Sequence, residues 1–382
     1  MDLNPKPMRN FLLPLMAAGL LSACTPSTST HENTELAAYF DHTGRDDAWT
    51  GGARRIPVET PLGTFHVWTK RVGNNPTLKV LLLHGGPGAT HEYFESADSY
   101  FPGAGIEYYY YDQLGSGNSD NPEDTALWNI ERFVSEVEQV RIALGLDASN
   151  FVLMGHSWGG ILAMEYALAH QEHLKGLIIS NMVASAPEYN RYAQEVLGPQ
   201  LPPDVLAEIK ALEAQGAYTS ERYLGLITEN YYPEHVLRRP LDAWPEPVNR
   251  SFAKLNYPLY LYMQGPSEFG IVGQATLRNW DRTADLPRIT VPTLAVGAEF
   301  DTMDPEGMRA IAQGVQNGSY LFCPGGGHMA MYDAADTYYP GIISFLLPLT
   351  PQLQAVMSWG VNLTLKHLTF ICLKAHCPKN GR

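Results

Sequence analysis

Short apolar runs alternate with amphipathic stretches through most of the central chain. The runs at 79–83 and 106–111 end in glycine-rich loops, as buried strands of a parallel sheet do. Residues 130–146 repeat apolar side chains with helical periodicity, 151–154 form another apolar run, and 161–169 begin a second helix. This alternation predicts an α/β fold, with a mostly parallel sheet flanked by helices.

The same pattern continues on both sides of this central region. Residues 56–72 alternate around a Pro-Leu-Gly turn at 61–63, which predicts a β-hairpin. Strand-like runs return at 290–296 and 319–322, and a helix is expected near 334–346. The predicted sheet therefore draws on two separated parts of the chain.

The interval 185–285 breaks the alternation. It contains helical patterns such as 203–215, many aromatic residues and several proline-punctuated turns. With 382 residues, the chain is long enough for one α/β domain that carries an insertion. We predict a core formed by 35–184 and 286–350, with 185–285 as an inserted, mainly helical cap.

The N-terminus has the composition of a secretory signal. Lys6 and Arg9 precede an apolar run at 11–21, which is too short to span a bilayer and is followed by small residues. We expect residues 1–23 to be a signal peptide.

The sequence Leu-Ser-Ala-Cys at 21–24 resembles the bacterial lipobox, in which cleavage precedes a cysteine that is then lipidated. Residues 24–34, rich in Ser and Thr, would be a flexible tether. The alternative is ordinary signal cleavage with Cys24 near the junction by chance. The prediction is an exported enzyme of the bacterial cell envelope, in the periplasm or at the outer membrane, that meets the membrane only through Cys24.

Charge and cysteine content narrow the possible partners. Acidic residues outnumber basic ones by 40 to 26, a net charge of −14, which argues against nucleic acid. Apart from Cys24, three cysteines remain: Cys323, Cys372 and Cys377. Cys372 and Cys377 could form a disulfide, or the Cys and His residues of the tail could bind metal, but their spacing is not a recognised zinc-binding pattern. The basic tail 351–382 has no assigned role.

The strongest chemical signal is Gly-His-Ser-Trp-Gly-Gly at 155–160, directly after a predicted strand and before a helix. It matches the G-x-S-x-G turn that exposes a nucleophilic serine. Glycines flank the serine because the turn is tight and strained. Ser157 is the predicted nucleophile.

A serine hydroxyl needs a general base, and the base needs a carboxylate to orient it. His328 lies in a glycine-rich loop, 325–328, just after a predicted strand. Asp301 follows the strand at 290–296, with Glu299 and Asp304 as rivals, and the order serine, acid, histidine suits this motif. Other downstream histidines are expected at a solvent-facing helix end or in the cap: His170, His173 and His235.

His-Gly-Gly-Pro-Gly at 84–88 follows the strand 79–83 and can aim a backbone N–H at a developing oxyanion. Gly86 is the candidate donor, and the N–H of Trp158 is the second. His84 and His156 lie in turns beside the site, and we assign neither a proton-transfer role.

These motifs resemble those of the proline iminopeptidases and tricorn-interacting aminopeptidases, serine peptidases of the α/β-hydrolase fold. The match comprises HGGPG at 84–88, DQLGSGNS at 112–119, the serine turn, GPSEF at 265–269 and NWD at 279–281. It runs from about residue 60 to about 347. The resemblance implies removal of an N-terminal residue, proline or another apolar one, from short peptides without a metal or organic cofactor, and supports Asp301 and His328.

The resemblance also implies that Glu268 holds the free α-ammonium group of the substrate. One departure concerns a second glutamate, which follows the catalytic aspartate in the tricorn-interacting members; Thr302 stands there, and Asp304 could substitute. An amidase or esterase acting on small amino-acid amides or esters therefore remains an alternative, as does a non-catalytic binding lipoprotein. Aromatic residues of the cap could line a pocket: Tyr231, Tyr232, Trp244, Tyr257, Tyr260, Tyr262 and Trp280. The oligomeric state is not predicted.

Overall fold

The computed structural model describes residues 36–350. The predicted signal peptide, Cys24, the tether and the tail 351–382 lie outside the described residues. None of the helices in the described part combines the length and apolarity required to cross a bilayer.

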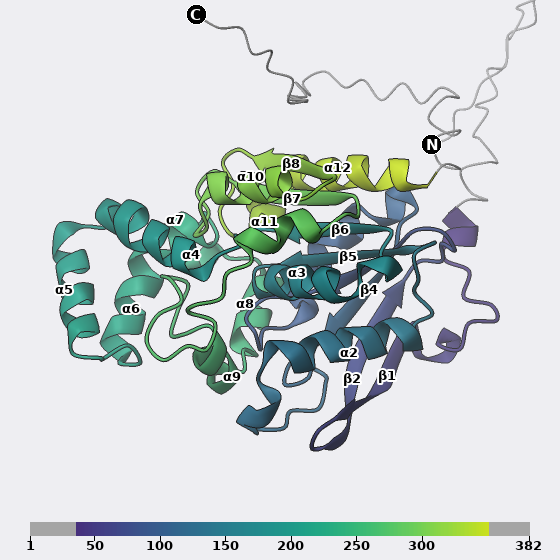
Figure 1. The fold of residues 1–382 in the computed structure, drawn as a ribbon, viewed down its shortest axis with the longest axis horizontal. Coiled ribbons are helices and arrows are strands. Elements are labelled where there is room, and N and C mark those ends of the chain that lie inside the picture. Colours follow the sequence, from purple (N-terminus) through teal and green to yellow (C-terminus); the bar gives the residue numbers. More distant parts are fainter. Residues whose placement is uncertain (1–35, 351–382) are drawn as a thin grey trace, which may run out of the picture.

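An eight-stranded sheet forms the centre of the molecule (Figure 1). Its spatial order is β1-β2-β4-β3-β5-β6-β7-β8; β2 pairs antiparallel with β1 and β4, and all other pairs are parallel. This confirms the mostly parallel sheet that the sequence predicts. The strands are β1 (Ala53–Thr60), β2 (Gly63–Val72), β3 (Lys79–Leu83), β4 (Glu107–Asp112), β5 (Phe151–His156), β6 (Gly176–Ser180), β7 (Thr293–Ala298) and β8 (Gly318–Cys323).

Helices cover both faces of the sheet. Alternate residues of β3 belong to two separate apolar clusters, Leu81 and Leu83 on one face and Val80 and Leu82 on the other. One face packs against α2 (Ile130–Ala143), α3 (Trp158–His170) and α10 (Pro305–Gly314); the other packs against the 3₁₀ segment η2 (His91–Ser99), α11 (Ala330–Asp333) and α12 (Ala335–Leu346). Apolar runs buried on both faces are the reason that these strands lack polar alternation.

Helix α2 shows how local sequence sets the ends of an element. Asn129 caps its start by accepting a hydrogen bond from the N–H of Arg132 at 2.9 Å. The predicted helix extended to 146, but α2 ends at Ala143 because Gly145, with φ of 64°, turns the chain into the left-handed region.

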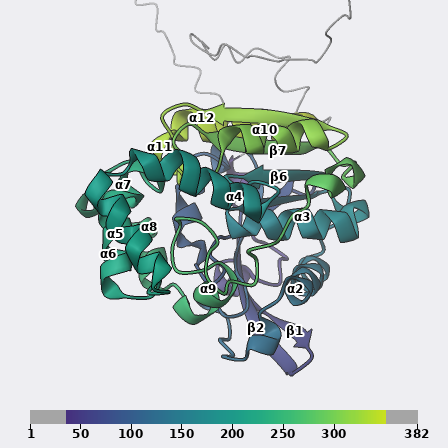
Figure 2. The same ribbon diagram turned by 60° about the vertical axis from the view of Figure 1, so that its left-hand side comes forward.

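The segment between β6 and β7 is mainly helical and stands beyond one end of the sheet. Figures 1 and 2 both show α5, α6 and α7 there, apart from α2 and α3. The helices of this segment are α4 (Ala186–Tyr192), α5 (Pro203–Ala214), α6 (Glu221–Asn230), α7 (Tyr232–His235), α8 (Glu246–Ala253) and α9 (Tyr257–Met263). We call this segment the cap.

Ion pairs connect the cap to η2 of the core. Arg250 of α8 contacts Glu95 of η2 at 2.7 Å, and Lys254 contacts Glu92. The N–H of Asn256 also donates to the carbonyl oxygen of Gly88 at 2.9 Å. The cap is therefore held against the loop that follows β3.

Candidate active site

Ser157 occupies the turn between β5 and α3. Its φ of 56° and ψ of −128° lie in a region that L-residues rarely adopt. A side chain on Gly155 would place its Cβ 1.9 Å from the carbonyl oxygen of Gly159, and one on Gly159 would place it 2.1 Å from that of Leu83. The glycines are therefore required for α3 to pass so close to β5 and β3.

Asp301 and His328 meet across the loops that follow β7 and β8. His328 Nδ1 lies 2.8 Å from Asp301 Oδ1, and both side chains are buried. Burial lowers the pKa of His328, but the charge of Asp301 and this hydrogen bond outweigh it and raise the pKa above its ordinary value. His328 Nε2 is buried and has no hydrogen-bond partner among residues 36–350, so it is available to take a proton from a group in the cavity.

The two rival acids lie elsewhere. Glu299 accepts a hydrogen bond from the N–H of Gly325 at 2.8 Å. Asp304 caps α10 by accepting from the N–H of Glu306 at 2.9 Å and lies 3.8 Å from Arg191. Neither carboxylate is in contact with His328.

Asn181 is a contact of Asp301 that the sequence analysis did not identify. It follows β6, has φ of 52°, and its side-chain amide donates to Asp301 Oδ2 at 2.6 Å. The N–H of Met303 donates to Oδ1 at 3.1 Å. Both carboxylate oxygens of Asp301 therefore have partners. An asparagine directly after a buried strand was the only signal in the sequence.

One cavity joins the residues predicted to carry the chemistry. It measures about 210 Å³ and is lined by Ser157, His328, Gly86 and Glu268. Other lining residues come from the cap and are largely apolar or aromatic: Leu224, Tyr232, Val236, Phe252, Leu255, Tyr257 and Tyr260. Of the aromatic residues singled out in the sequence, only Tyr232, Tyr257 and Tyr260 are in this lining.

The loop after β3 passes directly beside the serine. A Cβ added to Gly85 would lie 2.9 Å from Ser157 Cβ and 3.3 Å from its Oγ. Gly86 has φ of 105°, which favours glycine. Within the described part of the chain, the N–H groups of Gly86 and Trp158 have no backbone acceptor, and Trp158 begins α3, where the helix dipole favours negative charge.

Gln113, in the 112–119 motif, contacts both the serine turn and the 84–88 loop. Its side-chain oxygen accepts a hydrogen bond from Trp158 Nε1 at 2.9 Å, and its amide donates to the carbonyl oxygen of His84 at 3.0 Å. Its N–H also donates to His84 Nε2 at 3.0 Å. Gln113 thus joins the serine turn to the loop that carries Gly86.

His156 and Tyr93 form a second connection around the site. Burial and the nearby His328 lower the pKa of His156 to about 3, so its ring is neutral near neutral pH. Its Nε2 lies 2.9 Å from the carbonyl oxygen of His328, and its Nδ1 lies 3.1 Å from the Tyr93 hydroxyl. The N–H of Gly85 donates to that hydroxyl at 2.6 Å. Since a carbonyl only accepts, Nε2 carries the proton and Nδ1 accepts from Tyr93.

Glu268 lies buried among tyrosine hydroxyl groups. Tyr260 donates to its Oε1 at 2.6 Å, and Tyr189 lies 3.4 Å from Oε2. Among residues 36–350, Glu268 is the only carboxylate in the lining of this cavity. Thr302 is buried beside Asp301, with its hydroxyl 3.3 Å from Oδ1. Asp304 is not in the lining, so within the described part of the chain no second acid joins Glu268 in this cavity.

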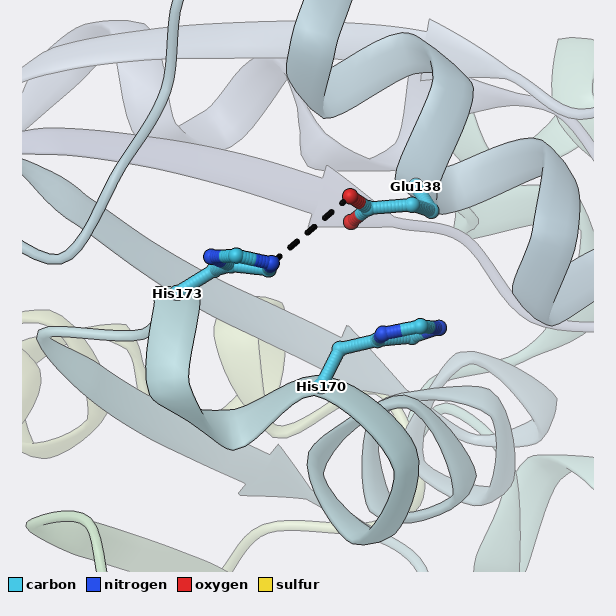
Figure 3. A group of neighbouring side chains, drawn as sticks. All are labelled: Glu138, His170 and His173. Atoms are coloured by element: carbon cyan, nitrogen blue, oxygen red, sulfur yellow. Dashed lines mark ion pairs between the residues drawn. The ribbon is translucent and has the colours of Figure 1, made fainter.

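Three potential metal ligands lie together at a different place. Glu138 of α2, His170 at the end of α3 and His173 of the following 3₁₀ segment η5 (Gln171–His173) have ligand atoms within 4.8 Å of one another (Figure 3). However, Arg141 donates to both Glu138 oxygens at 2.6 and 2.8 Å, and the Tyr166 hydroxyl donates at 2.7 Å. A metal ion would have to compete with this guanidinium, so we interpret the group as a network of charges that joins α2 to α3.

Comparisons with known proteins support the α/β-hydrolase fold and a relationship to proline iminopeptidases. Residues 79–335 match the family described as alpha/beta hydrolase fold. A proline iminopeptidase of Chitinophaga pinensis is 55% identical over 291 residues, which are 76% of this chain and 97% of that protein. One of Elizabethkingia meningoseptica is 54% identical over the same shares of each chain. The crystal structure of the Mycobacterium smegmatis proline iminopeptidase matches with a TM-score of 0.69 and 28% identity, covering 80% of this chain and 99% of that one.

Proposed function

Because this chain belongs to the proline iminopeptidases of the α/β-hydrolase family, we propose that it is a serine aminopeptidase that releases an N-terminal residue from short peptides. The observation that carries this assignment to particular residues is that Glu268 shares a cavity with Ser157 and His328. A buried carboxylate beside a nucleophile suits a substrate whose free amine lies next to the bond that is cleaved.

In the proposed reaction, Ser157 Oγ attacks the carbonyl carbon of the first residue while His328 Nε2 takes the hydroxyl proton. Asp301, 2.8 Å from Nδ1, fixes the tautomer of His328 and stabilises the imidazolium form. The N–H groups of Gly86 and Trp158 bind the oxyanion. His328 then protonates the leaving amine. In the second half of the reaction His328 takes a proton from water, which attacks the acyl carbonyl carbon, and returns the proton to Ser157 as the acyl group is released.

Glu268 selects the free α-ammonium group. Tyr260 at 2.6 Å holds one carboxylate oxygen, which leaves further acceptor positions for a substrate cation. Removal of the charge of Glu268 would leave a substrate ammonium unpaired in a buried site, at a cost of about 2 to 5 kcal/mol. Amine recognition here depends on this single carboxylate.

The first residue of the substrate is proposed to be proline or another apolar residue. Leu224, Val236, Phe252 and Leu255 give the cap side of the cavity an apolar wall. A ring or aliphatic side chain would bury its surface there, whereas a charged side chain would lose its hydration without a partner.

The test is hydrolysis of prolyl-, alanyl- and phenylalanyl-arylamides, each with a free and an acetylated amine. We expect turnover of free-amine substrates only, no activity for Ser157→Ala, and a kcat/KM lower by about 30-fold or more for Glu268→Gln. Equal reaction of acetylated substrates or simple esters, with Glu268→Gln unchanged, would instead support the amidase or esterase alternative.

We further propose that the protein is exported and anchored to the bacterial cell envelope through a lipid on Cys24. The proposal is supported by the basic, apolar and small-residue order of positions 1–24. Fractionation of cells that express the full chain tests it: wild type should remain with membranes, and Cys24→Ser should be released or retained as an unprocessed precursor. Wild type in the soluble fraction would contradict it.

A further inference from the structure

His235 links the cap to both loops of the acid–base pair. It ends α7 in the cap and is buried, and its Nδ1 lies 2.9 Å from the carbonyl oxygen of Phe300, the residue before Asp301. Its own carbonyl oxygen accepts a hydrogen bond from the N–H of His328 at 2.7 Å. One cap residue therefore contacts both the loop that carries Asp301 and the loop that carries His328.

The neighbours of His235 extend this connection. The N–H of Met329 donates to the carbonyl oxygen of Val236 at 2.7 Å. The Arg238 guanidinium lies 3.6 Å from the centre of the Phe300 ring, so the cap also packs on the loop of Asp301. Residues 235–238 thus lie along both catalytic loops.

The backbone of His328 is consequently fixed on both sides. Its N–H donates to the carbonyl of His235, and its carbonyl accepts from His156 Nε2 at 2.9 Å. The first of these contacts comes from the cap, and the second comes from the core beside Ser157. The position of the His328 imidazole therefore depends on how the cap packs against the core.

The state of the His235 ring follows from its contacts. Because Nδ1 faces a carbonyl oxygen, it carries the proton and donates. Burial lowers the pKa of His235, which keeps the ring neutral near neutral pH. The neutral His235 ring can therefore make the hydrogen bond to the Phe300 carbonyl oxygen only by donating from Nδ1.

We infer that His235 is a positioning residue, which holds the loops of Asp301 and His328 at the separation needed for proton transfer and makes that separation depend on the seated cap. The inference rests on the proposed function for its reaction. It does not require His235 to touch the substrate, and His235 is not in the lining of the cavity.

The test compares His235→Ala with His235→Asn, because the asparagine amide can place a donor near the position of Nδ1. The control is Val248→Ala, which removes buried apolar volume from α8 of the cap outside the cavity lining. Each variant is assayed for kcat and KM on a free-amine arylamide, for the pH dependence of kcat/KM, for thermal unfolding, and for the rate at which a fluorophosphonate labels Ser157.

For His235→Ala we expect kcat to fall by about 10- to 100-fold with little change in KM, since small displacements of reacting groups are costly. The low-pH limb of kcat/KM should move to lower pH, because the contact with Asp301 that raises the pKa of His328 is loosened. His235→Asn should recover most of the kcat, and Val248→Ala should unfold at lower temperature with kcat unchanged.

The inference is overturned if His235→Ala loses activity only in proportion to its folded fraction, with the pH limb unmoved, or if His235→Asn is as impaired as His235→Ala. Labelling by the fluorophosphonate separates this result from failure of the proposed function. If wild type is labelled rapidly but cleaves no aminopeptidase substrate, the function is wrong, and the labelling rates of the variants still decide the role of His235.

Discussion

The side-chain amide of Asn181 donates to Asp301 Oδ2 at 2.6 Å, while Oδ1 of the same carboxylate faces His328 Nδ1 at 2.8 Å. The two contacts fix the plane of the carboxylate. We predict that Asn181→Ala lowers kcat by about 10-fold or more, because a hydrogen bond to a charged group is worth roughly 1.5 to 3 kcal/mol. Steady-state kinetics on an arylamide measures this effect.

The matched control is Asn230→Ala in the cap, where the amide donates to the backbone carbonyl of Leu226 at 2.8 Å. That variant should keep the wild-type kcat. An Asn181→Ala enzyme with wild-type kcat would show that Asp301 does not need this amide to stay oriented.

The pH dependence of activity follows from the raised pKa of His328. In the proposed mechanism the neutral imidazole of His328 is the base, so kcat/KM should rise with pH through an apparent pKa above the ordinary value of 6.5. In Asp301→Asn the negative charge is lost, so the limb should move to lower pH and kcat should fall by about 10⁴-fold, as for the corresponding change in other serine triads. A wild-type limb at or below pH 6.5 would contradict this prediction.

The contribution of His328 to the free energy of unfolding falls as pH rises, whereas the activity is expected to rise. Because its pKa is raised in the folded state, the protonated form favours folding. This contribution is complete below the pKa of the unfolded chain and is lost as pH rises through the folded-state pKa. Urea unfolding followed across that range, for wild type and His328→Ala, should show a difference that shrinks as pH rises.

Tyr260→Phe tests the support of the amine site. The Tyr260 hydroxyl donates to Glu268 Oε1 at 2.6 Å, so its removal frees the carboxylate to rotate and should raise KM for free-amine substrates by about 10-fold. Tyr262→Phe, on the same helix but with 38% of its surface exposed, should behave as wild type. An unchanged KM in Tyr260→Phe would argue that Glu268 is held in place without it.

Tyr93→Phe tests the connection between the oxyanion loop and His328. The change removes the acceptor of the Gly85 N–H and the donor to His156 Nδ1, so two buried polar groups lose their partner. We expect the free energy of unfolding to fall by about 2 to 4 kcal/mol and kcat to fall as well. Denaturant unfolding and kinetics measure both. Tyr100→Phe, at a partly exposed position after η2, is the control, and equal losses in the two variants would contradict the prediction.

The sequence predicted a mostly parallel sheet because its buried strands are continuous apolar runs with short glycine-rich connections, and its motifs, by their resemblance to a known family, implied the α/β-hydrolase fold. The run at 79–83 coincides with β3. The strand expected at 290–296 instead begins at Thr293, directly after Pro292, which has no N–H to donate to a neighbouring strand. Motifs bounded by glycines singled out Ser157, Gly86 and Trp158, and the structure has Ser157 and Gly86 in the lining of one cavity, where the glycines allow close backbone approach.

Apolar periodicity and short motifs could not predict the contacts between segments that are distant in the sequence. Asn181 and Asp301 are 120 residues apart, and no periodicity connects them. His235 was assigned only to the cap, because its link to His328 runs through a backbone carbonyl, which any residue type possesses. Gln113 was recognised as part of a motif, but its bridge from Trp158 to His84 became evident only in three dimensions.

The left-handed backbone of Ser157 implies a trade-off between stability and activity at this one position. A non-glycine residue in such a conformation destabilises the fold by roughly 1 to 3 kcal/mol, and only part of that cost would be offset by the greater chain entropy of an unfolded glycine, about 0.5 to 1 kcal/mol. Replacement of Ser157 by glycine should thus give an inactive protein that resists unfolding better than the working enzyme. Selection for stability alone would favour glycine at this position, and the proposed role of Ser157 as the nucleophile explains why the strained serine is kept.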